Sequence, residues 1–343
     1  MITVKDLQKE YKIVKRDPGL KGAVKSLFNR KYERKQAVKG ISFSIEPGET
    51  VAYIGANGAG KSTTIKMLTG ILTPTYGVVT VNGIVPYENR QKNAKNIGAV
   101  FGQRTQLFWD IPVRESFDLL KHIYEVSEEE FQETLQMFTD VLQLEPLLGI
   151  PVRQLSLGQK MRCELAAAFL HRPKVVYLDE PTIGLDVAVK VRIRKFIREM
   201  NERWGTTVLL TTHDMQDIEE ICDRIIIIDE GTILYDGELA SIKRRFGQKR
   251  VIHFDMVQRD KFFLPELLAG KVDVLPVTEG EENKVSLSFD SDEVSSSIVI
   301  STMMNTFEVQ DLSISDPKIE TIVEEIFNKR EMGEEHEEIL AAN

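Results

Sequence analysis

Short apolar runs alternate with helical patterns over the first 245 residues of the 343-residue chain. The runs most typical of buried strands are residues 50–54, 97–101, 175–178, 208–210 and 225–228. Strands that are apolar on both faces are typical of parallel sheets, because helices cover both faces of such a sheet. The pattern therefore predicts an α/β fold built on a parallel sheet.

Three further strands and a helical block belong to the same region. Residues 2–11 and 78–81 have strand patterns, and residues 41–45 alternate between apolar and polar as a half-buried strand does. From 113 to 170 the apolar residues recur at helical spacing, for example at positions 117, 120, 123 and 124. We therefore expect a domain over residues 1–245 with a helical subdomain inserted at about residues 105–170.

The character of the chain changes after residue 246. Strand patterns occur at 250–257, 272–275, 284–287 and 309–314, and helical patterns occur at 262–268 and 294–307. This βαββαβ order predicts a small α+β domain of the ferredoxin-like type over residues 246–330. Asp316-Pro317 has the character of a helix start, and residues 331–343 form an acidic tail. We favour dimerisation as the role of this domain, with regulation as the alternative.

Residues 15–35 interrupt the first strands and are strongly basic. Eight Lys and Arg residues stand against only Asp17 and Glu33. Apolar residues at 20, 23, 24, 27 and 28 have helical spacing, which indicates an amphipathic helix that contacts lipid headgroups or a membrane partner. A solvated insertion between two strands is the alternative, and we favour it.

A phosphate-binding motif occupies residues 55–62, which read Gly-Ala-Asn-Gly-Ala-Gly-Lys-Ser between a strand and a helix. Glycines let successive backbone N–H groups turn toward phosphate oxygens, and the helix start adds its positive dipole end. Lys61 is expected to reach the β- and γ-phosphates, and the Ser62 hydroxyl to ligate Mg²⁺. The predicted nucleotide-binding residues here are Gly55, Asn57, Gly58, Ala59, Gly60, Lys61, Ser62 and Thr63.

Two acids, Asp179 and Glu180, end the apolar run at 175–178. An enzyme with a phosphate-binding loop needs a carboxylate on a neighbouring strand to hold Mg²⁺, and Asp179 is suited to that role. Glu180 would follow as the general base that polarises the attacking water. Solvated acids at a strand end are common, but the phosphate-binding motif in the same chain favours the functional interpretation.

A helix start follows the sequence Leu155-Ser156-Leu157-Gly158-Gln159. Ser156 with Gln159 three residues later is an ordinary capping box. The same stretch lies some 20 residues before the acidic strand end, and this position gives it a second interpretation. With these motifs the chain resembles the nucleotide-binding domains of ABC (ATP-binding cassette) ATPases, whose signature loop reads LSGGQ. Leu157 replaces the first glycine of that signature.

The resemblance, which covers roughly residues 2–245, implies further roles. Gln103 matches the Q-loop glutamine that senses Mg²⁺, and Asp186 matches the D-loop aspartate that contacts the opposing subunit. His213 matches the switch histidine on the γ-phosphate. Tyr11 is a candidate for the aromatic that stacks on adenine, with an edge-strand core residue as the alternative. The implied catalytic residues are Glu180, His213 and Gln103, and the implied metal ligands are Ser62, Gln103 and Asp179.

The family also closes ATP between the phosphate-binding loop of one subunit and the signature of another. This chain holds one of each, so the resemblance implies a homodimer, or a heterodimer with a second cassette. The signature residues that would act in trans are Ser156, Leu157, Gly158 and Gln159.

Charge and composition limit the kinds of partner that the chain is expected to bind. A net charge of −9 gives no overall attraction to nucleic acid, and we expect no nucleic-acid partner. No apolar run approaches the roughly 20 residues that a membrane span needs, so another polypeptide would have to cross any membrane involved. The resemblance implies that this polypeptide is a separate integral-membrane permease. The two cysteines, Cys163 and Cys222, fall in apolar elements and are expected to be reduced core residues.

Within the family, residues 68–75 and 180–186 are similar to the daunorubicin-resistance-type exporter ATPases of bacteria. The resemblance implies an ATPase subunit of an exporter, using ATP and Mg²⁺, at the cytoplasmic face of the cell membrane. A soluble ABC ATPase that acts on ribosomes or nucleic acid is the alternative. Against it, translation factors of that kind usually hold two cassettes, and this chain holds one.

Overall fold

The computed structural model describes residues 1–15, 31–102, 105–246, 249–276, 283–290, 293–315 and 319–331. These residues form two compact units that divide after Gly237. The division precedes the predicted boundary at residue 245, because α9 (Leu239–Phe246) belongs to the second unit, where it contacts α11 (Ile319–Glu331).

The first unit is built on a six-stranded sheet with the order β5-β6-β7-β3-β8-β9. The pairs β5–β6, β6–β7, β7–β3 and β3–β8 are parallel, which confirms the predicted parallel sheet. The strands are β3 (Thr50–Ile54), β5 (Ile97–Phe101), β6 (Val175–Asp179), β7 (Thr207–Thr211), β8 (Arg224–Asp229) and β9 (Thr232–Glu238).

A three-stranded antiparallel sheet with the order β2-β1-β4 completes the strands of this unit. Its strands are β1 (Ile2–Lys15), β2 (Lys31–Ile45) and β4 (Tyr76–Val81). β1 and β2 are longer than predicted: Lys15 and residues 31–35, assigned above to the insertion, lie in paired strands. The insertion is therefore shorter than predicted, and residues 16–30, which include every apolar position behind the helix hypothesis, lie outside the described part of the chain.

One apolar core joins the two sheets of the first unit. Ile2 and Leu7 of the smaller sheet share this core with Val51 and Tyr53 of the larger one. Helix α2 (Lys61–Leu68) contributes Ile65, which is fully buried. The packing fixes the loop between β3 and α2 next to the antiparallel sheet.

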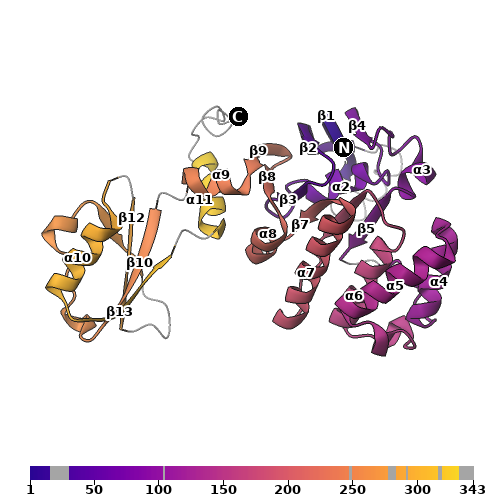
Figure 1. Ribbon diagram of the computed structural model, residues 1–343. Coiled ribbons are helices and arrows are strands. Elements are labelled where there is room, and N and C mark those ends of the chain that lie inside the picture. Colours follow the sequence, from indigo (N-terminus) through magenta and orange to yellow (C-terminus); the bar gives the residue numbers. More distant parts are fainter. Residues whose placement is uncertain are drawn as a thin grey trace, which may run out of the picture. The chain divides into compact units, whose positions relative to one another are not determined.

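The remaining helices of the first unit follow the predicted apolar spacing. α6 contacts α4 and α5, and Figure 1 shows these three helices grouped apart from β1, β2 and β4. The helices are α3 (Arg90–Ala94), α4 (Val113–Tyr124), α5 (Glu128–Leu142), α6 (Leu157–Phe169), α7 (Val187–Trp204) and α8 (Met215–Ile221), with 3₁₀ turns η1 (Glu145–Leu147) and η2 (Val152–Gln154).

The second unit contains an antiparallel sheet with the order β11-β12-β10-β13, the strand order of a ferredoxin-like fold. Its elements are β10 (Lys249–Met256), β11 (Val272–Val274), β12 (Lys284–Asp290), α10 (Ser296–Thr306) and β13 (Val309–Ser315).

The helix predicted at residues 262–268 is wrong. Only the 3₁₀ turns η3 (Arg259–Lys261) and η4 (Glu266–Leu268) occur there. Pro265 has no N–H to donate and disfavours the helical conformation of the residue before it, so the apolar spacing does not become a helix. The predicted helix start at Asp316-Pro317 and residues 332–343 of the tail lie outside the described residues.

Candidate nucleotide-binding and catalytic site

The loop between β3 and α2 needs its glycines for conformation and for space. Gly58 and Gly60 have positive φ angles of 87° and 111°. A Cβ atom at Gly60 would lie 2.5 Å from the carbonyl oxygen of Ala37, and one at Gly55 would lie 1.9 Å from that of Ile228. Close packing against β2 and β8 therefore turns the loop and the first turn of α2 toward open space.

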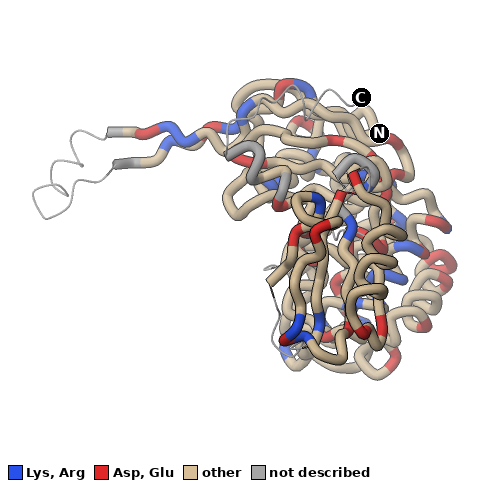
Figure 2. The backbone as a smooth tube through the Cα atoms, turned by 90° about the vertical axis from the view of Figure 1, so that its left-hand side faces the viewer, with Lys and Arg blue, Asp and Glu red and all other residues tan. Residues whose placement is uncertain are grey.

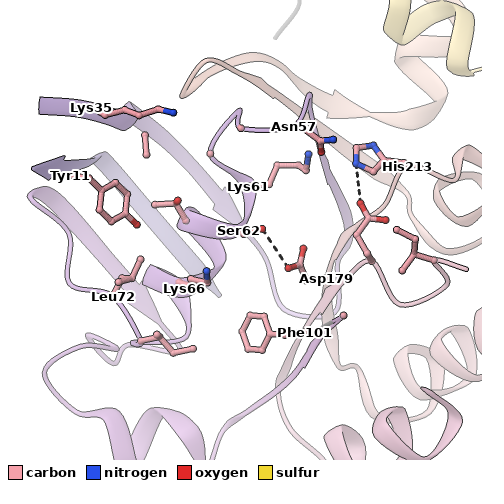
Figure 3. A pocket seen from close by; sticks show the side chains of 18 residues that line it. Tyr11, Lys35, Asn57, Lys61, Ser62, Lys66, Leu72, Phe101, Asp179 and His213 are labelled. Atoms are coloured by element: carbon pink, nitrogen blue, oxygen red, sulfur yellow. Dashed lines mark hydrogen bonds and ion pairs between the residues drawn. The ribbon is translucent and has the colours of Figure 1, made fainter. Parts of the chain in front are cut away.

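A cleft of about 970 Å³ opens beside this loop (Figure 3). Gly55 and Ala59 belong to the loop but are buried, and they do not line the cleft. Gln103 lies outside the described residues. The predicted residues that do line the cleft are Tyr11, Asn57, Gly58, Gly60, Lys61, Ser62, Thr63, Asp179, Glu180 and His213.

Lys61 is held at the mouth of the loop. Its ammonium group donates to the carbonyl oxygens of Gly55 and, at 3.1 Å, Ala56. The residue is only 8% exposed, and burial lowers its pKa, although the carboxylates of Glu180 and Asp179 oppose that effect. Lys61 thus presents a partly desolvated cation to a ligand in the cleft.

Oxygen atoms that could ligate a metal ion lie close together beside Lys61. The Ser62 hydroxyl lies 3.5 Å from Asp179 Oδ2, and the Thr211 hydroxyl donates to Asp179 Oδ1 at 2.6 Å. No cluster of three or more His, Cys, Asp or Glu side chains suited to a metal occurs among the described residues. One hydroxyl and one carboxylate match Mg²⁺, which usually keeps several waters and takes its remaining ligands from phosphates.

Glu180 follows directly after β6, and His213 follows β7. His213 Nε2 lies 3.2 Å from Glu180 Oε1. Figure 3 shows His213 on the same side of the cleft as Asp179. Burial raises the pKa of Glu180, and the nearby charges of His213 and Lys61 limit the rise. A carboxylate with a raised pKa beside a histidine is suited to accepting a proton from water.

The other end of the cleft is formed by the antiparallel sheet. Tyr11 lines this end at 37% exposure, and Lys9 Nζ lies 5.6 Å from the centroid of its ring. Several further cleft residues were not predicted as site residues, although Ile71, Leu72 and Ile183 lie in stretches that were matched to the family. The residues not predicted are Lys35, Ala37, Lys66, Ile71, Leu72, Phe101, Gly102 and Ile183.

Comparison with known proteins identifies the family. Residues 38–183 match the family model described as ABC transporter. The linearmycin resistance ATP-binding protein LnrL of Bacillus subtilis (strain 168) is 30% identical over 293 residues, which cover 85% of this chain and 93% of that protein. The chain belongs to the ABC transporter family of ATP-binding proteins.

Other ABC proteins extend the comparison. The Nod factor export ATP-binding protein I of Rhizobium meliloti is 36% identical over 208 residues, 61% of this chain and 62% of that protein. A dimeric post-hydrolysis structure of the cassette MJ0796 with ADP and phosphate has a TM-score of 0.58 at 27% identity, covering 70% of this chain and 99% of that one. This ABC protein is therefore an ATPase subunit of a transporter with the expected cassette fold.

The signature of this ABC ATPase lies outside its own cleft. Ser156 and Gln159 form the predicted capping box at the start of α6: the Ser156 hydroxyl accepts from Gln159 N, and Ser156 N donates to Gln159 Oε1 at 2.8 Å. None of residues 156–159 lines the cleft. Leu157 is 53% exposed, and its Cδ2 atom lies 3.4 Å from the position that a Cβ of Gly184 would occupy. The residue that departs from the family signature thus lies against the D-loop.

Asp186 of the D-loop is the N-cap of α7, where its side chain accepts from Val189 N at 3.0 Å. It does not line the cleft. Near it, Ile183 and Val187 expose more than half of their surface. The signature and the D-loop therefore share an exposed, partly apolar surface.

A buried charge network joins the D-loop to the loop of His213. Asp217 of α8 is fully buried and accepts from the hydroxyls of Thr182 and Thr212, the latter at 3.0 Å. Its other oxygen accepts from Nε of Arg194 at 2.6 Å, and Arg194 is only 2% exposed. Because Thr182 follows Glu180 closely and Thr212 precedes His213, Asp217 connects the segments that carry Glu180 and His213.

The segment after residue 104 is fixed to the signature helix. The buried carboxylate of Glu164 accepts from the Thr105 hydroxyl and from Gln106 N at 3.1 Å. Lys160 Nζ lies 5.4 Å from the centroid of the Trp109 ring. Phe108, Trp109, Leu119 and Ile123 nevertheless expose large apolar surfaces beside these contacts.

Proposed function

We propose that this ATPase powers export through a separate membrane permease, by binding ATP between two copies of the cassette and releasing them after hydrolysis. The observation that carries the proposal is the convergence of Lys61, Asp179, Glu180 and His213 on one cleft, with the signature on a different surface. The first group of residues acts on the phosphates of its own nucleotide, and the signature completes the site of the partner.

The cleft residues divide the chemistry of hydrolysis between them. Lys61 binds the β- and γ-phosphates, and the glycine loop donates its N–H groups to phosphate oxygens. Glu180 accepts the proton of the water that attacks the γ-phosphorus, while the bond from that phosphorus to the bridging oxygen breaks and ADP leaves. His213 orients Glu180 and contacts the γ-phosphate.

Ser62 and Asp179 would hold Mg²⁺, together with Gln103 and oxygens of the nucleotide. When bound, Mg²⁺ would neutralise charge that develops on the phosphates. The short distance between the Ser62 hydroxyl and Asp179 supports this assignment, since both atoms could then be reached from one octahedral ion.

The exposed signature supports the dimer. In a head-to-tail pair, Ser156, Gly158 and the start of α6 would donate hydrogen bonds to the γ-phosphate held by the other subunit. Asp186 and the apolar surface of the D-loop would be covered in the same contact. Loss of the γ-phosphate removes the group that both subunits bind, so the pair opens.

The permease is proposed to dock beside the signature helix. The exposed apolar side chains of Phe108, Trp109, Leu119 and Ile123 support this, since exposed apolar surface often marks a protein-binding site. Leu119 and Ile123 belong to α4, and Phe108 N donates to Ser116 Oγ of the same helix at 3.2 Å. No helix among the described residues has the length and apolar character that crossing a membrane requires. The cassette would thus reach the cytoplasmic face of the cell membrane through its permease.

Export is proposed from the relatives. LnrL is named for linearmycin resistance and the Rhizobium protein for Nod factor export. The direction of transport in this system would match theirs, while the permease selects the substrate.

Affinity purification tests the proposal. Tagged Glu180→Gln chain is purified with ATP and Mg²⁺ from detergent-solubilised host membranes, and bound proteins are identified by mass spectrometry. We expect one or two polytopic membrane proteins in a ratio near one to one with the cassette. Recovery of ribosomal proteins instead, with the cassette missing from the membrane fraction, would contradict the proposal.

A further inference from the structure

β1 and β2 continue as a two-stranded ribbon beyond the antiparallel sheet. β4 pairs with β1 only as far as Gln8, whereas β1 and β2 stay paired to Lys15 and Lys31. Figure 2 shows the ribbon leaving the body of its unit. Cross-strand partners point to the same face, and successive residues point to opposite faces. Tyr11 and its partner Lys35 therefore share one face.

The face with Tyr11 and Lys35 forms one wall of the nucleotide cleft. Figure 3 shows both residues, with Lys66, on the side of the cleft opposite to Asp179 and His213. The acids that line the cleft are Asp179 and Glu180, and both lie at the hydrolysis end. The Tyr11 end of the cleft therefore carries positive charge from lysine without an acid in its lining.

The charge of Lys35 is available to a ligand. Its neighbour Arg34, on the opposite face, lies 3.6 Å from Glu10, which also accepts from Gln36 Nε2 at 3.1 Å. Lys9, beside Tyr11, donates to the carbonyl oxygen of Thr73 at 2.6 Å. Within the described part of the chain, Lys35 makes no such hydrogen bond or ion pair.

The position of Lys35 selects the group it would bind. The inference rests on the proposed function and on Tyr11 as the candidate aromatic for adenine. If adenine stacks on Tyr11 and Lys61 holds the β- and γ-phosphates, the ribose and the α-phosphate lie between them. Of these two groups only the α-phosphate is anionic, and an ammonium group with three donors suits a phosphate oxygen. We infer that Lys35 is a further nucleotide-binding residue, whose ammonium group binds the α-phosphate.

Displacement of a fluorescent ADP analogue from the full chain tests this inference. In Lys35→Met, the affinities for ADP and AMP should fall about tenfold, as expected for the loss of one charge-assisted hydrogen bond. The affinity for adenosine, which lacks the phosphate, should not change. Lys12→Met is the matched control, because Lys12 pairs with Arg34 on the opposite face of the same ribbon. It should leave all three affinities unchanged, and Lys35→Arg should retain most of the binding of ADP and AMP.

Equal affinities of Lys35→Met and the unmodified chain for ADP and AMP would overturn the inference. A loss that includes adenosine would also overturn it, since it would assign Lys35 to the base or to the structure of the ribbon. Failure of the unmodified chain to bind ADP or ATP is a different result, because it would contradict the proposed function as a whole.

Discussion

Glu180 has an unusual backbone conformation and a carboxyl group with a raised pKa. Its φ angle of 55° lies in the left-handed region, which residues with a side chain seldom adopt. Burial raises the pKa of its carboxyl group, while His213, 3.2 Å away, opposes the rise. A general base must be deprotonated to act, so if Glu180 is the base, as proposed, its pKa limits hydrolysis at acid pH.

We predict that kcat for ATP hydrolysis falls with decreasing pH before the ordinary range of a glutamate is reached. A raised pKa means that Glu180 is already protonated, and unable to accept a proton, at a pH where an exposed glutamate is still ionised. The measurement is kcat at saturating ATP and Mg²⁺ across the acid range, with circular dichroism to verify folding at each pH. A rate that stayed constant down to pH 4.5, the ordinary pKa of a glutamate, would contradict the prediction.

At the scale of elements, α7 and α8 are joined to the two catalytic loops by one buried ion pair. Arg194 on α7 meets Asp217 on α8, and Asp217 in turn accepts from Thr182 and Thr212. The hydroxyl groups of Thr182 and Thr212 hold the Asp217 carboxylate in position, so the D-loop and the loop of His213 are bound to the same side chain. Breaking this pair would leave the buried Arg194 guanidinium with only the partly exposed carboxylates of Asp214 and Glu220 as partners.

Asp217→Ala should lower the free energy of unfolding by about 3 kcal/mol, because the buried Arg194 guanidinium then loses its fully buried carboxylate partner. Urea unfolding measures this change. Glu220→Gln is the control: Glu220 also contacts Arg194, at 3.2 Å, but it is 41% exposed, so its loss should cost less than about 1 kcal/mol. Similar losses in both variants would show that burial of the pair is not what matters.

Local patterns predicted the elements that carry the chemistry, and long-range packing decided what they missed. The glycine loop and the acids after β6 are readable because strand, loop and helix follow one another in sequence. Lys35 could not be predicted in this way. Its place in the cleft depends on pairing with Tyr11, from which residues 16–30 separate it in the sequence. Pro265 was the local signal that should have excluded a helix at 262–268. The contact of Leu157 with Gly184 has no local signal at all.

At the scale of the whole molecule, the proposed mechanism gives one chain two incomplete parts of an ATP site. The cleft holds the phosphate loop with Asp179 and Glu180, and the predicted signature at the start of α6 does not line it. Leu157, Ile183 and Val187 add exposed apolar area around the signature. Two copies related head to tail would complete two sites and cover this area, which makes ATP part of the interface.

The molar mass of Glu180→Gln in solution tests this account most directly. The substitution removes the base while keeping the shape of the side chain, so ATP should persist and hold two copies together. Size-exclusion chromatography with light scattering should give about twice the chain mass of 39.0 kDa with ATP and Mg²⁺, and a lower mass with ADP. Adding Ser156→Arg, which obstructs the signature, should abolish the ATP-dependent increase. A mass that does not respond to ATP, together with undiminished ATPase activity, would contradict the account.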